Sequence, residues 1–272
     1  MEQESIKIKF IDTHAHLDFE NFDQDRDAVI KNAQLANIAA IINIGINLDT
    51  IKKSIELAET YDFMYATAGI HPHDSKDMKS YQWGEFTELL RHPKIVAIGE
   101  VGLDYYRDYS PPDVQIEVLH KQIDLAAEHD LPVVVHTRNA WQDILPIFME
   151  QYRGKLKGVF HCFSGSEREA KIVLDSGYFI SFTGVVTFKN AKALNIAANY
   201  VSLDRLLLET DCPFMAPEPF RGKRCEPAHI PFIAKKIAEA KNLDVATLAQ
   251  QTNRNVEKLF GVKIQAMQNS KI

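Results

Sequence analysis

Short runs of apolar residues alternate along the chain with longer segments whose apolar residues recur at helical spacing. Eight runs are rich in β-branched residues and have the length of buried strands. They are IKFID (8–12), AAIINIG (39–45), FMYATAG (63–69), KIVAIGE (94–100), LPVVVH (131–136), GVFHC (158–162), YFISFTG (178–184) and DRLLLETD (204–211).

The segments between these runs have the pattern of amphipathic helices, as at 48–61, 111–130 and 168–177, with two further helices predicted at 230–242 and 245–261. Strands separated by helices pair in parallel through right-handed crossovers. Eight such units predict an α/β fold, a closed (β/α)₈ TIM barrel. No repeat, low-complexity segment or break in composition marks a linker, so residues 1–272 are expected to form a single domain.

The composition is that of an ordinary globular protein, with 46% hydrophobic and 25% charged residues. The net charge of −6 argues against indiscriminate binding to nucleic acid but allows a local basic patch. Three cysteines suit a reducing compartment, and neither a signal-peptide pattern nor a membrane-length apolar run is present. We therefore expect a cytoplasmic protein without a membrane segment. The sequence does not determine the oligomeric state, and a monomer is compatible with it.

Potential ligands follow most of the predicted strands, where barrel enzymes collect their catalytic residues. A lone histidine at a strand end is more often a hydrogen-bonded residue than a ligand. Several donors at one rim favour a metal site, because their burial without a cation would be costly. The donors, in chain order, are His14, His16, His71, Glu100, His136, His161 and Asp211.

His14 and His16 are two residues apart on a strand, so both side chains point to the same face and can reach one ion. Asp12 is a third potential ligand in this segment. Imidazole and carboxylate favour Zn²⁺ or Mn²⁺ and also allow Mg²⁺. Glu100 is placed to bridge to a second ion. Two divalent ions about 3.5–4 Å apart would position a hydroxide and neutralise a phosphate, as in many phosphoesterases.

The remaining cysteines and histidines favour structural roles. Cys162 and Cys212 adjoin His161 and Asp211 but face away from them, which predicts buried free thiols. Three histidines in helices or at helix ends are expected to be structural or solvated, namely His92, His120 and His129. The role of His73 is undecided.

A basic loop after the eighth run is the first candidate for binding phosphate, and it contains Arg221, Lys223 and Arg224. Phosphate sites in barrels often form from the loops after strands seven and eight. The alternative is a solvated charge run. Arg138 is a second candidate, since a guanidinium group matches phosphate oxygens, and His71 is expected to contact the substrate.

Six motifs in this order resemble the TatD family of metal-dependent deoxyribonucleases: THAHLD (13–18), GIHPH (69–73), AIGEVGLDY (97–105), PVVVHTRNA (132–140), HCFSG (161–165) and ETDCPFMAPEPFRGKR (209–224). The resemblance covers almost the whole chain. It implies a barrel hydrolase that acts on DNA with divalent metal ions.

The resemblance also implies a role for six of the seven donors. One ion is held by His14 and His16, a carboxylate bridge is supplied by Glu100, the second ion is held by His136 and His161, and Asp211 is a ligand that also orients or deprotonates the attacking water. One departure is Cys225, because members of the family commonly have asparagine there. The substitution is expected to alter the anchoring of the loop or its contact with substrate.

Three functions remain open on the sequence. The first is a DNA phosphodiesterase, the second a hydrolase of an amide or ester such as a cyclic amide or an aminoacyl-tRNA, and the third a non-enzymatic metal-binding protein. Ligands converging near the barrel axis predict a pocket that admits single-stranded ends and excludes an internal duplex phosphodiester. An exonuclease on single-stranded DNA is therefore expected, with the 3′ to 5′ direction implied by the resemblance.

Overall fold

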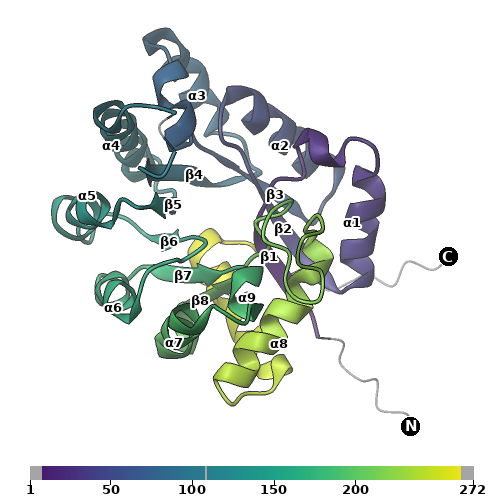
Figure 1. Cartoon of the computed structure of the whole chain (residues 1–272). Coiled ribbons are helices and arrows are strands. Elements are labelled where there is room, and N and C mark those ends of the chain that lie inside the picture. Colours follow the sequence, from purple (N-terminus) through teal and green to yellow (C-terminus); the bar gives the residue numbers. More distant parts are fainter. Residues whose placement is uncertain (1–7, 108, 265–272) are drawn as a thin grey trace.

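The eight strands form one parallel sheet that curls into a barrel (Figure 1). The structure is a computed structural model that describes residues 8–107 and 109–264, so the predicted domain 1–272 extends beyond the described residues at both ends. Each strand pairs in parallel with the next along the chain. The strands are β1 (Phe10–Ala15), β2 (Ile38–Ile44), β3 (Met64–Ala68), β4 (Ile95–Asp104), β5 (Val133–Arg138), β6 (Gly158–Phe160), β7 (Phe179–Phe182) and β8 (Leu206–Leu208). The predicted TIM barrel is confirmed.

Most of the helices form a ring outside the strands, and the last helix packs against the apolar cluster at one end of the barrel (Figure 1). The helices are α1 (Arg26–Leu35), α2 (Leu48–Thr60), α3 (Trp83–Leu89), α4 (Pro112–Glu128), α5 (Trp141–Pro146), α6 (Glu167–Asp175), α7 (Lys192–Tyr200), α8 (Ile230–Ala240) and α9 (Val245–Phe260). All five helices predicted by position are present as α2, α4, α6, α8 and α9. Within the described residues, no helix has the length and apolar character needed to cross a membrane.

The barrel closes where β1 meets the residues that follow β8. The amide of Asp211 donates to the carbonyl of His14 at 2.8 Å, and the amide of His16 donates to the carbonyl of Cys212 at 2.9 Å. The carboxylate of Asp12 accepts hydrogen bonds from the amide and the hydroxyl of Thr210 at 2.9 and 2.5 Å. Asp12 therefore joins the two edges of the sheet at this seam. The sequence allowed it as a metal ligand, but it is not one of the converging donors.

The two ends of the barrel have different characters. A buried apolar cluster takes residues from seven of the eight strands, including Ile42 of β2 and Leu207 of β8, with Tyr65 of β3 packed beside it. Val256 and Phe260 of α9 belong to the same cluster. Apolar side chains thus fill the interior beside α9, and the potential ligands lie at the C-terminal ends of the strands, here called the mouth.

The segment after β1 is held by a buried amide. Asn43 of β2 accepts a hydrogen bond from the amide of Leu17 at 2.7 Å and donates to Asp18 and Ser54 at 2.7 and 2.8 Å. Asn43 is fully buried, so these bonds satisfy groups that water cannot reach. They fix the chain directly after His16.

Candidate metal centre

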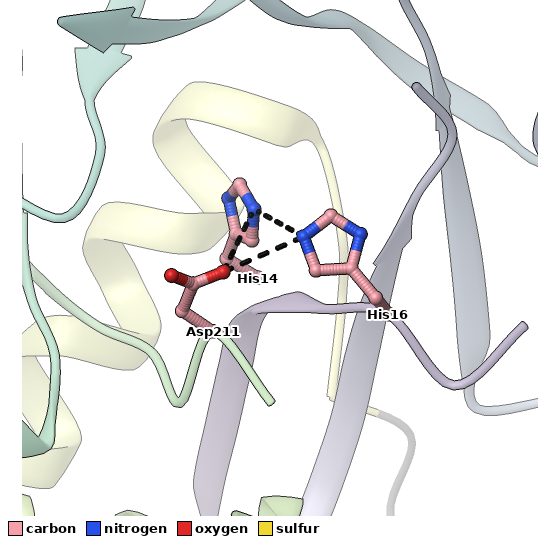
Figure 2. A group of neighbouring side chains, drawn as sticks. All are labelled: His14, His16 and Asp211. Atoms are coloured by element: carbon pink, nitrogen blue, oxygen red, sulfur yellow. Dashed lines mark hydrogen bonds and ion pairs between the residues drawn. The ribbon is translucent and has the colours of Figure 1, made fainter. Parts of the chain in front are cut away.

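Three donor atoms from β1 and the end of β8 converge at the seam of the barrel. Figure 2 shows the rings of His14 and His16 facing one carboxylate oxygen of Asp211. The Nε2 atoms of the two histidines are 3.2 Å apart, and they lie 3.6 and 3.4 Å from Asp211 Oδ1. Ligand atoms that each lie about 2.0–2.2 Å from one ion are separated from one another by distances close to those between these three atoms. The three atoms are therefore arranged as a metal-binding group.

The local backbone and neighbouring groups aim these side chains. His16 Nδ1 lies 3.2 Å from the carbonyl oxygen of Ile44, which leaves Nε2 as the ring nitrogen that faces the other donors. Asp211 has a left-handed backbone with φ of 55°, an uncommon conformation for a residue with a side chain. This turn brings its carboxylate back over β1.

Glu100 of β4 lies between two groups of histidines. Its Oε2 is 3.4 Å from His14 Nε2 and 3.9 Å from His16 Nε2. Its Oε1 is 2.6 Å from both His136 Nδ1 and His161 Nε2, and these two nitrogens are 3.3 Å apart. The two oxygens of one buried carboxylate thus face opposite sides of the site. All six ligand residues predicted from the sequence are brought together.

Asp104, at the end of β4, is a site residue that the sequence reasoning did not single out. Its Oδ2 lies 3.1 Å from His136 Nε2 and 3.0 Å from His73 Nε2. This contact turns His136 Nδ1 toward Glu100. The sequence feature that could have identified Asp104 is its position four residues after Glu100 on the same strand, because strand residues an even number apart share a face.

Glu209 is a second residue that the sequence reasoning did not single out. It lies near Nδ1 of His161, whereas Glu100 contacts Nε2 of the same ring. The Glu209 carboxylate accepts hydrogen bonds from the amide of Cys162 at 2.5 Å and from the hydroxyl of Ser181 at 2.7 Å. His161 Nδ1 lies 3.6 Å from Glu209 Oε1. This separation is longer than a hydrogen bond, so Glu209 acts on the ring through its charge, which adds to the charge of Glu100 in raising the pKa of His161.

His71, expected to contact substrate, lies beside this pair. Its Nε2 is 3.5 Å from Glu100 Oε1, and its Nδ1 accepts a hydrogen bond from the amide of His73 at 3.1 Å. Burial lowers the pKa of His71 to about 4. A neutral ring whose Nδ1 is an acceptor carries its proton on Nε2, so His71 presents an N–H group to the site.

The electrostatic balance of the site favours a cation. Burial by itself would raise the pKa of Glu100, but the charge of His161 and the hydrogen bond from His136 outweigh it and hold that pKa well below its usual range. Burial also opposes ionisation of Asp211, yet its hydrogen bond from His16 and the nearby histidine charges lower its pKa. Both carboxylates are therefore ionised at neutral pH.

The histidines around these carboxylates differ in their tendency to be protonated. Burial and the charge of His161 lower the pKa of His14, and its buried Nδ1 has no hydrogen-bond partner among the described residues. Burial opposes protonation of His161 as well, but the charge of Glu100 and its hydrogen bond raise that pKa well above the usual value. Without a metal ion, His161 therefore carries a proton that compensates the charge of Glu100, and a bound divalent ion would take the place of that proton. Imidazole nitrogens and ionised oxygens in a buried site are the ligand set of divalent transition metals. The residues therefore fit metal ions.

The three basic residues of the predicted phosphate-binding loop differ in whether their charges are already paired. Arg224 contacts both carboxylate oxygens of Asp25 at 2.8 and 2.7 Å and Glu226 at 3.0 Å, so its charge is already paired. Arg221 and Lys223 are exposed, and the only ion pair of Arg221 among the described residues joins it to Glu218 at 4.0 Å. The loop therefore keeps two accessible positive charges near the mouth.

Arg138, the second phosphate candidate, is exposed two residues after His136. Its guanidinium group stacks on the ring of Tyr106, with the central carbon 3.8 Å from the ring centroid. Arg138 forms no ion pair in the part of the chain that the structure describes, so its charge remains available at the mouth.

The cysteines are free thiols and none belongs to a metal-binding group of the described residues. The predicted burial holds for Cys212 but is wrong for Cys162, which is half-buried with its Sγ 3.3 Å from Met215 Sδ. Cys225 is fully buried, and its amide donates to the carbonyl of Pro213. The loop is therefore anchored through its backbone at this position.

The histidines expected outside the site lie away from it. His92 contacts Glu59 at 3.2 Å, His120 of α4 contacts the hydroxyl of Tyr152 at 3.2 Å, and His129 follows α4 at its C-terminal end. Structural or solvated roles fit these positions.

Comparison with known proteins agrees with this geometry. The family model described as TatD related DNase matches residues 11–261. The uncharacterized metal-dependent hydrolase YabD of Bacillus subtilis is 43% identical over 251 residues, covering 92% of this chain and 98% of that protein. The 3′-5′ ssDNA/RNA exonuclease TatD of Citrobacter koseri is 35% identical over 257 residues, covering 92% and 98%.

The crystal structure of the TatD homolog YJJV from Escherichia coli superposes with a TM-score of 0.88 at 30% identity, covering 94% of this chain and 99% of that one. The sequence match spans nearly the entire chain, and it includes the residues that form the buried cluster of histidines and carboxylates. The chain belongs to the TatD-related DNase family of metal-dependent hydrolases.

Proposed function

We propose that this protein is a nuclease that uses two divalent ions to remove nucleotides from the 3′ ends of single-stranded DNA. The observation that carries the proposal is the position of Glu100, whose two oxygens face separate groups of nitrogen ligands. His14, His16 and Asp211 would hold one ion, and His136 and His161 the other, with Glu100 between them. Bound ions of this kind lower the pKa of water and neutralise a phosphate.

Asp211 is the residue suited to take the proton of the attacking water. One of its oxygens faces the two histidines, and the other points away from both rings (Figure 2). The carboxylate is ionised at neutral pH, so this second oxygen carries no proton and can accept a hydrogen bond from the attacking water. His71 Nε2, which carries a proton, would donate a hydrogen bond to a phosphate oxygen of the substrate.

Burial of the ligands supports a preference for strand ends. The exposed fractions of His14, His16, Glu100 and Asp211 are 0, 3, 4 and 7%. An internal phosphodiester of a rigid duplex cannot descend to buried ligands, whereas a flexible terminus can. The relative from Citrobacter koseri is named as an enzyme of this direction and substrate, and we extend that assignment to this chain. We also propose that the protein acts in the cytoplasm.

The positive groups at the mouth favour a phosphodiester over a neutral amide or ester. Arg138, Arg221 and Lys223 are exposed around an acidic centre in a protein of net charge −6. Guanidinium and ammonium groups bind phosphates of a nucleic-acid backbone. A cyclic amide or a simple ester offers these side chains no charged partner.

The first prediction concerns Glu100. Glu100→Gln removes the negative charge shared by the two histidine groups, so we expect the loss of about one ion per chain and a fall in kcat of about 100-fold or more. Elemental analysis after gel filtration measures the metal content. Glu257→Gln, on the exposed face of α9, is the matched control. Full metal content and full activity in Glu100→Gln would remove Glu100 from the centre.

The second prediction concerns Asp211. Asp211→Asn keeps a ligand oxygen but removes the proton acceptor, so kcat is expected to fall by about 100- to 10,000-fold while KM changes little. Steady-state kinetics on an end-labelled oligonucleotide separate the two constants, and Asp204→Asn is an exposed control before β8. A kcat equal to that of the unmodified enzyme would reject this role.

The third prediction concerns the basic loop. Replacing Arg221 and Lys223 by alanine removes two phosphate contacts, so a plot of log affinity for single-stranded DNA against log salt should become shallower by about 1.4. Metal content is expected to stay unchanged. Replacing Arg254 and Lys258 of α9 by alanine makes the same change of charge at the other end of the barrel. An equal effect of both double variants would assign the loop to nonspecific attraction.

The nuclease function itself is tested with metal-stripped protein reconstituted with Mg²⁺, Mn²⁺ or Zn²⁺. We expect mononucleotides to be released from an end-labelled linear single strand, and a circular single strand of the same composition to remain intact. A generic ester and a cyclic amide serve as competing substrates. Faster hydrolysis of either one would favour the amide or ester function, and cleavage of the circle at the linear rate would identify an endonuclease.

A further inference from the structure

Exposed aromatic rings occur at two places on the mouth of the barrel. Tyr106 and Tyr109, in the loop after β4, have exposed fractions of 54 and 51%, and Phe214, in the loop after β8, is 51% exposed. Single exposed apolar residues are common on soluble proteins. These three differ in position, because each adjoins side chains that reach into the metal centre.

The first group is built on Asp104 and the histidines around it. Asp104 Oδ1 accepts a hydrogen bond from the amide of Tyr106 at 2.9 Å, while its Oδ2 contacts His136 and His73. The ring of Tyr109 packs edge-on against His73, with centroids 4.8 Å apart. Arg138 covers the ring of Tyr106. A path of planar groups thus leads from the ligand His136 to solvent.

The second group lies over the seam of the barrel. Phe19 stacks on the ligand His16, with centroids 4.6 Å apart and an angle of 23° between the planes. Phe214 packs edge-on against Phe19 at 6.4 Å. The amide of Phe214 donates to the carbonyl of Asp211 at 3.0 Å, which fixes this ring three residues beyond a ligand. A second path of rings therefore runs from the metal centre to solvent.

The strand order places the two groups on opposite sides of the mouth. The sheet runs from β1 to β8 in sequence order and closes between its ends. The first group follows β4 and β5, and the second follows β1 and β8, half a turn around the barrel (Figure 1). The ligands lie between them.

Resting on the nuclease function proposed above, we propose that the two groups, Tyr106–Tyr109–Arg138 and Phe19–Phe214, are stacking subsites for nucleobases. Bases of a single strand stack on aromatic rings and on arginine planes when they are splayed apart. A phosphate at the metal centre would have one flanking base directed toward each subsite. The charge on Arg138 serves the neighbouring backbone phosphate. The subsites accept any base, because every base has a flat π face.

The proposal is tested with a single-stranded oligonucleotide whose last two 3′ positions carry either natural bases or abasic tetrahydrofuran residues. For the unmodified enzyme, kcat/KM on the natural strand is expected to exceed that on a strand with one abasic position by about 5- to 150-fold. In each of the variants Tyr106→Leu and Phe214→Leu, this ratio is expected to fall toward one when the abasic residue occupies the position whose base would stack on the altered subsite. The ratio for the other position stays high. Tyr106→Phe and Phe214→Tyr keep a flat ring and restore the ratio.

Tyr200→Leu, an exposed tyrosine at the end of α7, is the control and keeps the ratio of the unmodified enzyme. Metal content is measured for each variant and is expected to remain unchanged. Equal cleavage of natural and abasic strands by the unmodified enzyme, or an unchanged ratio in both leucine variants, overturns the subsites and leaves the nuclease function standing. No cleavage of any single strand, together with hydrolysis of the ester or amide, overturns both proposals.

Discussion

The buried carboxylate of Glu100 is the constraint on which the rest of the site depends. It lies among five other ligand side chains from both halves of the barrel, and its oxygens contact His14 on one side and His136 and His161 on the other. An ionised group at 4% exposure is costly to bury unless positive charge surrounds it. The histidines around Glu100 supply this compensation, either by holding a proton or by holding a metal ion.

A second set of buried polar groups determines which ring nitrogens face Glu100. Asp104 holds His136 by its Nε2, and the carbonyl of Ile44 lies against His16 Nδ1. Glu209 lies behind His161 and also accepts the amide of Cys162. These groups come from three different strands or their ends. Only a barrel that has already closed can bring them into contact, so formation of the site and closure of the sheet are coupled.

The barrel separates stability from chemistry along its axis. Apolar residues of the strands and of α9 fill one part of the interior, while the mouth carries the ligands and is edged by exposed rings and by positive side chains. This arrangement suits a substrate that combines negative phosphates with flat apolar bases. It also explains how a protein of net charge −6 can attract a nucleic acid, because the positive groups act locally at the mouth.

The sequence by itself determined the fold and singled out the side chains that are proposed here as metal ligands. Eight β-branched runs separated by helical segments specify a parallel barrel, and the polar residues at the ends of those runs must meet at one rim because parallel strands share a direction. The spacing of these residues did not divide them into two groups around Glu100; only the resemblance to the TatD family implied that division, and the contacts of Glu100 agree with it. The sequence also could not show that Asp12 fastens the seam, that Arg224 is paired with Asp25 or that Tyr106 stacks on Arg138. Each of these outcomes depends on side-chain contacts between segments far apart in the chain, and such distances are set only when the barrel has closed.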